Sequence, residues 1–281
     1  MTGAPVAPIA RVLGISRSSA YRETRPRSSR YERRDDRAVT SQMKSVIGTR
    51  ASYGARRVRA LVNRDFGTGY NLKRIGRLME INGWKLPRSL RRRSGRAHIG
   101  LIRREMSNER WCSDAMEISC WNGEYVQMAF ALDCCDREAI DFVAAPRDLR
   151  ATDIQQLMTG AVACRFGHGN RADSPIQWLS DNGSIYTALD TVIAAERLNL
   201  APITTPAMSP QSNGMSEAFV NTIKRDYVAM ADRSTAAAVM DQISSWIADY
   251  NAVAPHSALG FKSPDEYRKE QKNVREVAQM S

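Results

Sequence analysis

Two carboxylates, Asp181 and Glu217, have thirty-five residues between them and lie in stretches of different character. Asp181 ends the apolar run 175–181 and precedes Asn182-Gly183, a pattern that predicts a buried strand leading into a turn. In open α/β sheets, ligands bind beyond the carboxyl ends of the strands. Asp181 could therefore line a ligand site, although Asp is also common in ordinary turns.

Glu217 lies near the start of a predicted helix over 215–230. Residues four apart in this helix form one apolar stripe, consisting of Met215, Phe219, Ile223 and Tyr227. Glu217 points away from the stripe, and Asn221 and Lys224 share its face. An ordinary solvated helix face is one interpretation. The other is a phosphate-binding edge, which would need a cation such as Lys224 along the same face.

Asp114 is the third acid that metal chemistry would need. Strand alternation over 110–120 places it on one face with apolar residues only, namely Cys112, Met116, Ile118 and Cys120. A carboxylate buried there needs a partner or a metal. Sites of phosphoryl transfer commonly hold two divalent metals about 3.5–4 Å apart. We therefore expect Asp114 to join the two other acids, and we interpret three further acids as hairpin residues: Asp133, Asp136 and Asp141.

Several stretches around these acids carry a resemblance to a known family. They are Asp-Asn-Gly-Ser at 181–184, S-N-G-M-S-E-A-F at 212–219, I-K-R-D-Y at 223–227 and Y-N-A-V-A-P-H-S-A-L-G-F-K-S-P-D-E-Y at 250–267. Together with the three acids, they resemble the second-frame (OrfB) transposases of bacterial insertion sequences, which have the DDE triad of the retroviral-integrase superfamily. The run F-A-L-D-C-C-D-R-E-A at 130–139 is similar to one subgroup. The family often has Arg where this chain has Ala254, a departure that affects no carboxylate.

The resemblance implies a DNA transposase in which Asp114, Asp181 and Glu217 are catalytic and bind two Mg²⁺ or Mn²⁺ ions. Such an enzyme cleaves DNA at the ends of an insertion sequence and transfers the strands to target DNA. The implied partners are double-stranded DNA, further copies of the chain in a homo-oligomer, and an upstream-frame OrfA protein, separate or fused. The alternatives are an RNase H-fold DNA nuclease without strand transfer and a catalytically silent DNA-binding regulator of transposition.

Basic residues are concentrated in the first part of the chain. Residues 1–110 contain 27 Lys and Arg against 8 Asp and Glu, whereas residues 111–281 contain 14 against 22. This asymmetry indicates a nucleic-acid-binding arm joined to a separate folded unit, with a solvated basic surface as the alternative. The side chains expected to contact DNA are Arg56, Arg57, Lys73, Arg74, Arg77, Arg91, Arg92, Arg93, Asn221, Lys224 and Arg225.

The same patterns predict how the chain is divided. The expected segments are a basic N-terminal segment at 1–37, a small helical DNA-binding domain at 38–86, a basic linker at 87–110, a catalytic core with C-terminal helices at 111–270 and a tail at 271–281. Residues 7–22 are typical of either a short helix-turn-helix or a disordered basic tail. The three helices expected in 38–86 are similar to the helix-turn-helix region of the same transposases, and which helix reads bases stays open.

The core is expected to be α/β. Three antiparallel strands are predicted first, and a helix, a strand, a helix, a strand and the Glu217 helix follow. The predicted ranges are 110–120, 125–133, 139–145, 151–166, 175–180, 187–198, 200–204 and 215–230, with a further helix at 235–250. With the resemblance, this order implies an RNase H-like mixed sheet flanked by helices.

Other features of the sequence limit the class of protein. No apolar run reaches 18 residues, and the N-terminus lacks a secretory pattern, so we expect no membrane span. Five cysteines without a C-x-x-C pair fit free, buried thiols in a reducing bacterial cytoplasm, at the nucleoid. Three scattered histidines exclude the His-His-Cys-Cys zinc module of retroviral integrases.

Overall fold

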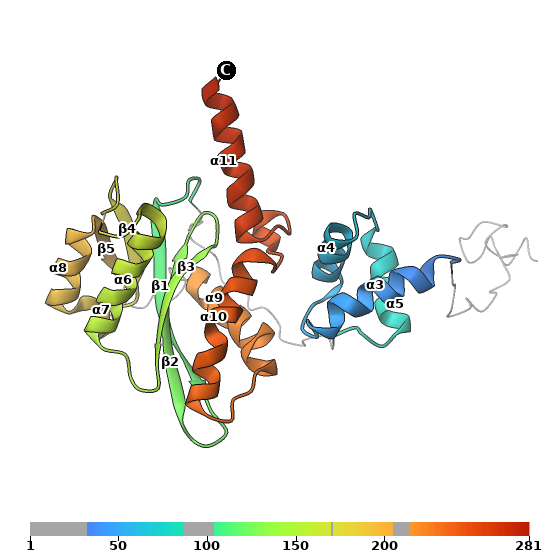
Figure 1. The fold of residues 1–281 in the computed structure, drawn as a ribbon, viewed down its shortest axis with the longest axis horizontal. Coiled ribbons are helices and arrows are strands. Elements are labelled where there is room, and N and C mark those ends of the chain that lie inside the picture. The colour runs from blue at the N-terminus through green and yellow to red at the C-terminus, as the bar shows by residue number, and fades with distance from the viewer. Residues whose placement is uncertain (1–32, 87–103, 170, 205–213, 281) are drawn as a thin grey trace, which may run out of the picture.

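A computed structural model describes residues 33–86, 104–169, 171–204 and 214–280. Within these ranges, three helices form one domain and a sheet with helices on both faces forms another (Figure 1). The predicted helix-turn-helix at 7–22 lies outside the described residues, as do Arg91, Arg92 and Arg93.

The helical domain consists of α3 (Asp36–Gly48), α4 (Ala55–Asp65) and α5 (Leu72–Ile81). Asn71 caps α5, because its side-chain oxygen accepts a hydrogen bond from the backbone N–H of Arg74 at 2.8 Å. The apolar stripes of the three helices meet in one buried cluster, made of Val39, Met43, Val46, Tyr53, Val58, Leu61, Val62, Ile75, Leu78 and Met79. This domain therefore has a hydrophobic core of its own.

The sheet contains β1 (Arg110–Ser119), β2 (Tyr125–Asp133), β3 (Ala139–Ala145), β4 (Ile176–Ser180) and β5 (Leu200–Thr204). The strand order is β3-β2-β1-β4-β5. Neighbours are antiparallel from β3 to β1 and parallel from β1 to β5. The predicted mixed sheet is confirmed, since tight turns join the first three strands and helical crossovers join the rest.

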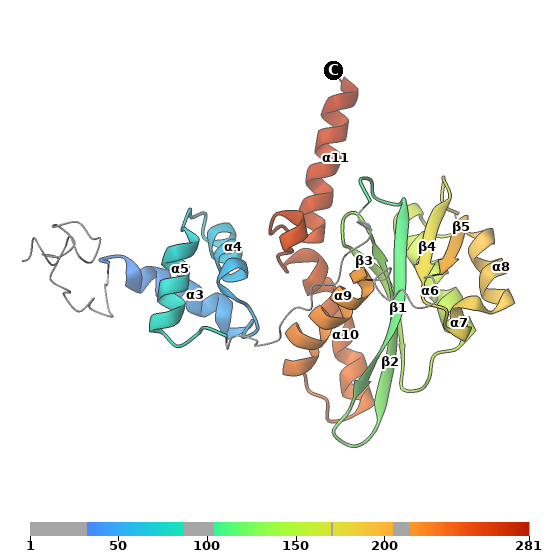
Figure 2. The same ribbon diagram turned by 180° about the vertical axis from the view of Figure 1, so that it is seen from behind.

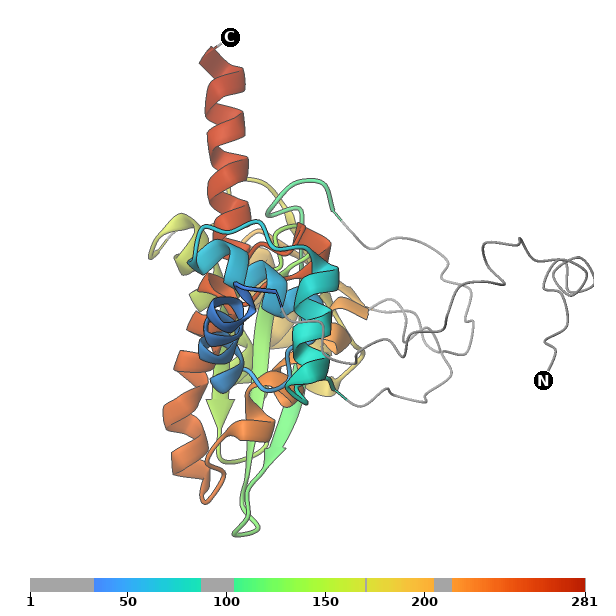
Figure 3. The ribbon, with the colours of Figure 1, turned by 90° about the vertical axis from the view of Figure 1, so that its right-hand side faces the viewer.

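Helices cover both faces of the sheet (Figure 1). One face packs against α6 (Ala151–Phe166), the short α7 (Ser184–Thr187) and α8 (Leu189–Arg197). The other face packs against α9 (Gly214–Asp226) and α10 (Ala236–Ala252). The last helix, α11 (Pro264–Met280), extends beyond the rest of the domain (Figure 3).

Two predicted helices differ from the structure in extent. The helix expected over 187–198 begins two residues later, as α8, because Ala188 has an extended backbone with φ −56° and ψ 137° that separates it from the short α7. The helix expected over 215–230 ends at Asp226, and Tyr227 and the 3₁₀ turn Val228–Met230 follow. Neither difference moves an acid out of its predicted element.

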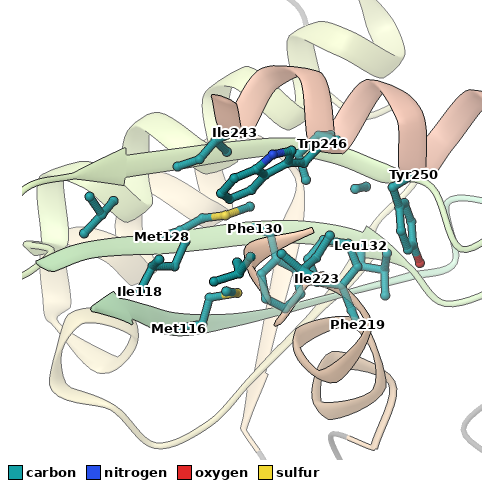
Figure 4. Close-up of a cluster of buried hydrophobic side chains, with 14 of the residues drawn as sticks. Met116, Ile118, Met128, Phe130, Leu132, Phe219, Ile223, Ile243, Trp246 and Tyr250 are labelled. Atoms are coloured by element: carbon teal, nitrogen blue, oxygen red, sulfur yellow. The ribbon is translucent and has the colours of Figure 1, made fainter. Parts of the chain in front are cut away.

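The core on the α9 side of the sheet is rich in aromatic residues (Figure 4). The ring centroids of Phe130 and Phe219 lie 4.2 Å apart, and those of Phe219 and Tyr250 lie 4.9 Å apart. Phe130 belongs to β2, Phe219 to α9 and Tyr250 to α10, so these rings join three elements. Buried aromatic contacts of this kind hold α9 firmly over the middle of the sheet.

Candidate active site

Asp114 lies on β1, and Asp181 directly follows the end of the neighbouring strand β4, at the same level. In the parallel pairing of β1 with β4, Cys112 stands opposite Leu179, and the two acids each follow two residues later. Cys112 and Leu179 both belong to the core on the α9 side, so alternation turns both acids toward that side. Neighbouring strands are about 4.8 Å apart, which brings the two backbones within reach of a shared ligand.

Glu217 reaches the same region from α9. Its neighbours on the apolar stripe, Met215 and Phe219, are buried against the sheet, whereas Glu217 is exposed on the first turn of the helix. Ser216 is fully buried and hydrogen-bonds the thiol of Cys112. This contact ties the residue before Glu217 to the strand that carries Asp114.

The electrostatics of Asp114 show that the charges of Asp181 and Glu217 act on its carboxyl group. Burial raises the pKa of its carboxyl group, a hydrogen bond from the backbone N–H of Ala115 lowers it, and the charges of Asp181 and Glu217 raise it further. The net shift is upward. Among the residues that the structure describes, no Lys or Arg forms an ion pair with any of the three acids.

The turn after Asp181 depends on glycine. The Asp181 Oδ1 atom accepts a hydrogen bond from the backbone N–H of Gly183 at 3.0 Å. A Cβ atom at position 183 would lie 2.9 Å from that oxygen, closer than side chains normally approach. Gly183 thus leaves room for the Asp181 carboxylate beside the backbone N–H that it accepts from.

The donor set suits hard divalent cations, but its side chains are not assembled around one. As the side chains stand, no group of three or more His, Cys, Asp or Glu within the described ranges could hold a metal ion. The three acids would supply only carboxylate oxygens, which Mg²⁺ and Mn²⁺ prefer. The residue types therefore fit such a cation, and side-chain rotation would be needed to bind it.

Sequence analysis missed Tyr186, which lies beneath the acids. Its hydroxyl lies 3.0 Å from the Ser113 Oγ atom, and both side chains are buried. Burial raises the pKa of the tyrosine strongly, and the negative charges of Asp114 and Asp181 add to the rise. Because Ser113 precedes Asp114 and Tyr186 follows Asp181 by five residues, this contact links the two acid-bearing segments. An aromatic residue shortly after Asp-Asn-Gly was the available signal.

The turn between β2 and β3 gathers acids that serve the fold. Asp133 and Asp136 are fully buried, and the Arg165 guanidinium, 2% exposed, lies 3.8 Å and 3.2 Å from their carboxylates. The Asp133 carboxylate also accepts hydrogen bonds from the backbone N–H groups of Asn108, Cys135 and Asp136 and from the Trp111 indole. These contacts show that the Asp133 carboxylate stabilises the turn between β2 and β3.

Asp141 lies where the sequence indicated, whereas Cys164 does not. Asp141 belongs to β3, a strand of the predicted hairpin, and it faces Gly160 of α6, where a Cβ atom would come within 1.9 Å of its Oδ2 atom. The predicted free thiols are buried at Cys112, Cys120, Cys134 and Cys135, but Cys164 is exposed. The missing side chain at Gly160 therefore creates the space that Asp141 occupies.

Among the described residues, some of the candidate DNA-contacting side chains are exposed without an ion pair, and the others form ion pairs within the chain. Asn221 and Lys224 are exposed on α9 along the face of Glu217, and Arg56 and Lys73 are exposed on the helical domain. The remaining described candidates form ion pairs within the chain: Arg57 and Arg225 with Asp226, and Arg74 and Arg77 with Asp36. Their charges partly stabilise the fold.

Comparison with known families identifies the class of protein. Residues 104–210 and 199–264 each match a family model described as an integrase core domain, and residues 34–93 match one described as an HTH-like domain. The chain thus combines an integrase-type α/β core with a preceding helix-turn-helix-like domain. No helix in the described ranges combines the length and apolarity needed to span a membrane.

Relatives then define the family. Transposase InsD for insertion element IS2A/D/F/H/I/K of Escherichia coli is 42% identical over 238 residues, which cover 83% of this chain and 79% of that protein. Transposase InsD for insertion element IS2-9 of Escherichia coli K12 has the same identity over 83% and 77%. The chain belongs to this family of insertion-element transposases. It is a DNA transposase, an enzyme of the DDE transposase and integrase type.

Among solved structures, the chain is similar to one from a simian T-cell lymphotropic virus intasome bound to a PP2A regulatory subunit. The sequence identity is 14%, the alignment covers 81% of this chain and 73% of that one, and the TM-score is 0.49.

Proposed function

We propose that Asp114, Asp181 and Glu217 are the catalytic acids of this transposase and that together they hold Mg²⁺ or Mn²⁺ in a two-metal site. The observation that carries the proposal is the placement of these acids on β1, directly after the neighbouring β4 and on the first turn of α9, near enough for the charges of Asp181 and Glu217 to act on Asp114. Carboxylates kept together without cationic partners repel one another unless a cation is bound. Bound divalent cations would stabilise the attacking and leaving oxygens of an in-line phosphodiester displacement.

The elements around the acids hold them in place for this role. Asp114 is carried by β1, and Asp181 directly follows β4, which pairs with β1 in the sheet. Glu217 is carried by a helix whose apolar stripe is buried in the same core. Rigid elements of this kind place reacting groups more exactly than loops do, which supports a catalytic assignment.

The substrate is DNA, and the finer assignment of partners is part of the proposal. The HTH-like domain and the basic first part of the chain support binding of double-stranded DNA. We expect it to act on the ends of an insertion sequence and on a target, as a homo-oligomer, and with an upstream-frame OrfA protein or as a fusion with it. We expect this in the bacterial cytoplasm, where the nucleoid lies.

Joining of a donor end tests this function. The assay uses DNA with the terminal repeats of the flanking insertion element, a supplied 3′-hydroxyl end and Mg²⁺ or Mn²⁺. We expect the wild-type chain to join donor to target, and each of Asp114→Asn, Asp181→Asn and Glu217→Gln to lose at least about 10³-fold in rate while keeping DNA affinity. A variant with near wild-type joining would remove its residue from the site. Hydrolysis without joining by the wild type would favour a nuclease.

A further inference from the structure

The two domains meet through complementary charges, with the helical domain on the α9 side of the sheet (Figure 2). The contacts come from residues that are far apart in sequence. We name this set the clasp; its members are Arg50, Ser52, Arg57 and Arg64 in the helical domain and Asp226, Asp249 and Glu266 in the sheet domain.

Asp226 is the most buried acid of the clasp, with 3% of its side chain exposed. Its carboxylate accepts hydrogen bonds from the Ser52 hydroxyl at 2.6 Å and from the Arg57 guanidinium at 2.6 Å. Burial alone would raise the pKa of Asp226, but hydrogen bonds from Arg225, Arg57 and Ser52 lower it overall. Two of these three donors come from the helical domain. The helical domain therefore keeps the buried Asp226 carboxylate charged.

A second pair adds directional contacts. The Arg50 guanidinium donates to both carboxylate oxygens of Asp249, at 2.7 Å and 2.6 Å, and the Tyr227 hydroxyl donates to the same acid at 2.9 Å. Arg64 donates to the backbone carbonyl of Val253 at 3.1 Å and to Glu266 at 3.2 Å. Bidentate guanidinium–carboxylate pairs fix orientation as well as distance.

Apolar packing accompanies these charges. Val253 of the sheet domain packs against the hydrophobic core of the helical domain. Tyr53, 2% exposed, lies under the Arg57 guanidinium, which is 3.9 Å from its ring centroid. The clasp therefore combines paired charges with a shared apolar contact, which distinguishes it from a loose electrostatic encounter.

The clasp joins the helical domain to the helix that carries Glu217. Asp226 is the last residue of α9 and follows Glu217 by nine residues, about 13 Å at the rise of an α-helix. Any DNA held by the exposed side chains of the helical domain is therefore placed relative to α9. Arg57 faces the clasp, whereas the neighbouring Arg56 is exposed and available to DNA.

We propose that the clasp sets which phosphodiester of a bound element end is cleaved, by fixing the helical domain relative to the three acids. The inference rests on the proposed function and adds to it a set of positioning residues. Arg50 and Asp249 act on the reaction only through the orientation of the two domains. The alternative to this positioning role is a clasp that must open before DNA can reach the three acids.

Charge reversal tests the positioning role. We expect Arg50→Asp and Asp249→Arg, compared at equal folded fraction by circular dichroism, to lower cleavage at the wild-type position about 10-fold and to spread cuts over neighbouring nucleotides. The double variant should restore the wild-type cut, since it recreates the pair with its charges exchanged. Affinity for end DNA should stay within about 2-fold in all three variants, because neither residue is an expected DNA contact.

The outcomes separate this inference from the proposed function. Cuts at the wild-type position in both single variants, or a double variant no better than the singles, would overturn the positioning role while leaving DNA joining by the acids intact. A wild-type chain that does not join DNA would instead count against the proposed function.

A disulfide lock separates positioning from opening. Ser52→Cys and Asp226→Cys would place two thiols across the clasp, in a Cys164→Ser background that removes the exposed native thiol. After oxidation with diamide, we expect the locked protein to keep the wild-type cut position. Joining that is lost on oxidation and restored by a reductant would overturn the proposal, because it would mean that the clasp must open.

Discussion

The acids of the proposed active site and the acids of the β2–β3 turn have opposite surroundings. Asp133 and Asp136 are completely buried, yet the Arg165 guanidinium and several N–H groups meet their oxygens. Asp114 is only half-buried, and the charges nearest to it are those of other carboxylates. The difference teaches that burial of an acid does not by itself mark function. An acid whose neighbouring charges are other carboxylates indicates a site for a cation that is not a side chain of this protein.

The largest expected effect is on the paired side of this comparison. Replacing Arg165 by Met should lower the free energy of unfolding by about 3–5 kcal/mol, because it leaves the buried Asp133 carboxylate without a counter-charge and leaves Asp136 with only the more exposed Arg268, 3.7 Å away. Thermal unfolding should show a fall in Tm of about 10 °C. Arg147→Met is the matched control, since Arg147 forms a more exposed pair with Asp153 and should cost about 1 kcal/mol or less. Equal losses in both variants would contradict the distinction.

Basic side chains near the three proposed catalytic acids should affect the rate of DNA joining and not the stability of the protein. Lys224→Ala should lower joining about 10-fold, because this exposed lysine shares the helix face of Glu217 and can contact a neighbouring phosphate. Arg225→Ala should lower joining less, since Arg225 is turned about 100° around the helix and pairs with Asp226. Joining rates at two salt concentrations check this. Equal, mild losses in both variants would mean a diffuse basic surface.

Relief of repulsion among the unpaired acids should stabilise the protein. In metal-free buffer with EDTA, Asp114→Asn should raise Tm by about 2 °C, because it removes a charge whose pKa is raised by burial and by Asp181 and Glu217. The same variant should lose the rise in Tm that Mn²⁺ gives to the wild type. A lower Tm without metal would show that Asp114 contributes to folding as the paired acids do.

Near neutral pH, we expect the paired acids of the clasp to have the smallest effect on how stability changes with pH. The pKa values of Asp226 and Asp249 are lowered in the folded state by their hydrogen bonds, despite burial. The stability that they contribute is therefore fully present above the unfolded value of 3.8 and is lost as the pH falls through the lower folded values. Unfolding of Asp249→Asn and wild type between pH 7 and pH 3 checks this: their difference should be constant down to about pH 5 and shrink below pH 4. A difference that shrinks between pH 7 and pH 5 would contradict it.

Local patterns in the sequence were sufficient for much of the fold. Strands β2 and β3 begin and end at the predicted residues, and Asn71, a residue type typical of N-caps, caps α5. Asp114 lies on the apolar face of β1 that the alternation indicated. These features depend on near neighbours in the chain. The repeat of apolar residues along strands and helices and the residue types that cap helices are therefore enough to predict them.

Helix ends were less predictable, because tertiary contacts decide them. The apolar stripe alone would continue α9 to Tyr227 and beyond. The helix stops at Asp226, which accepts hydrogen bonds from Ser52 and Arg57, 174 and 169 residues away. Nothing in the sequence around position 226 indicates such partners.

The types and spacing of the three acids, their elements and the basic character of the first part of the chain could be predicted from the residues alone. The pairing of charges, the contact of Tyr186 with Ser113 and the contact of Arg57 with Asp226 depend on the packed fold. The difference lies in the distance along the chain over which each feature is decided. Strand and helix periods come from neighbouring residues, whereas pairing of charges depends on which distant surfaces the packed core brings together.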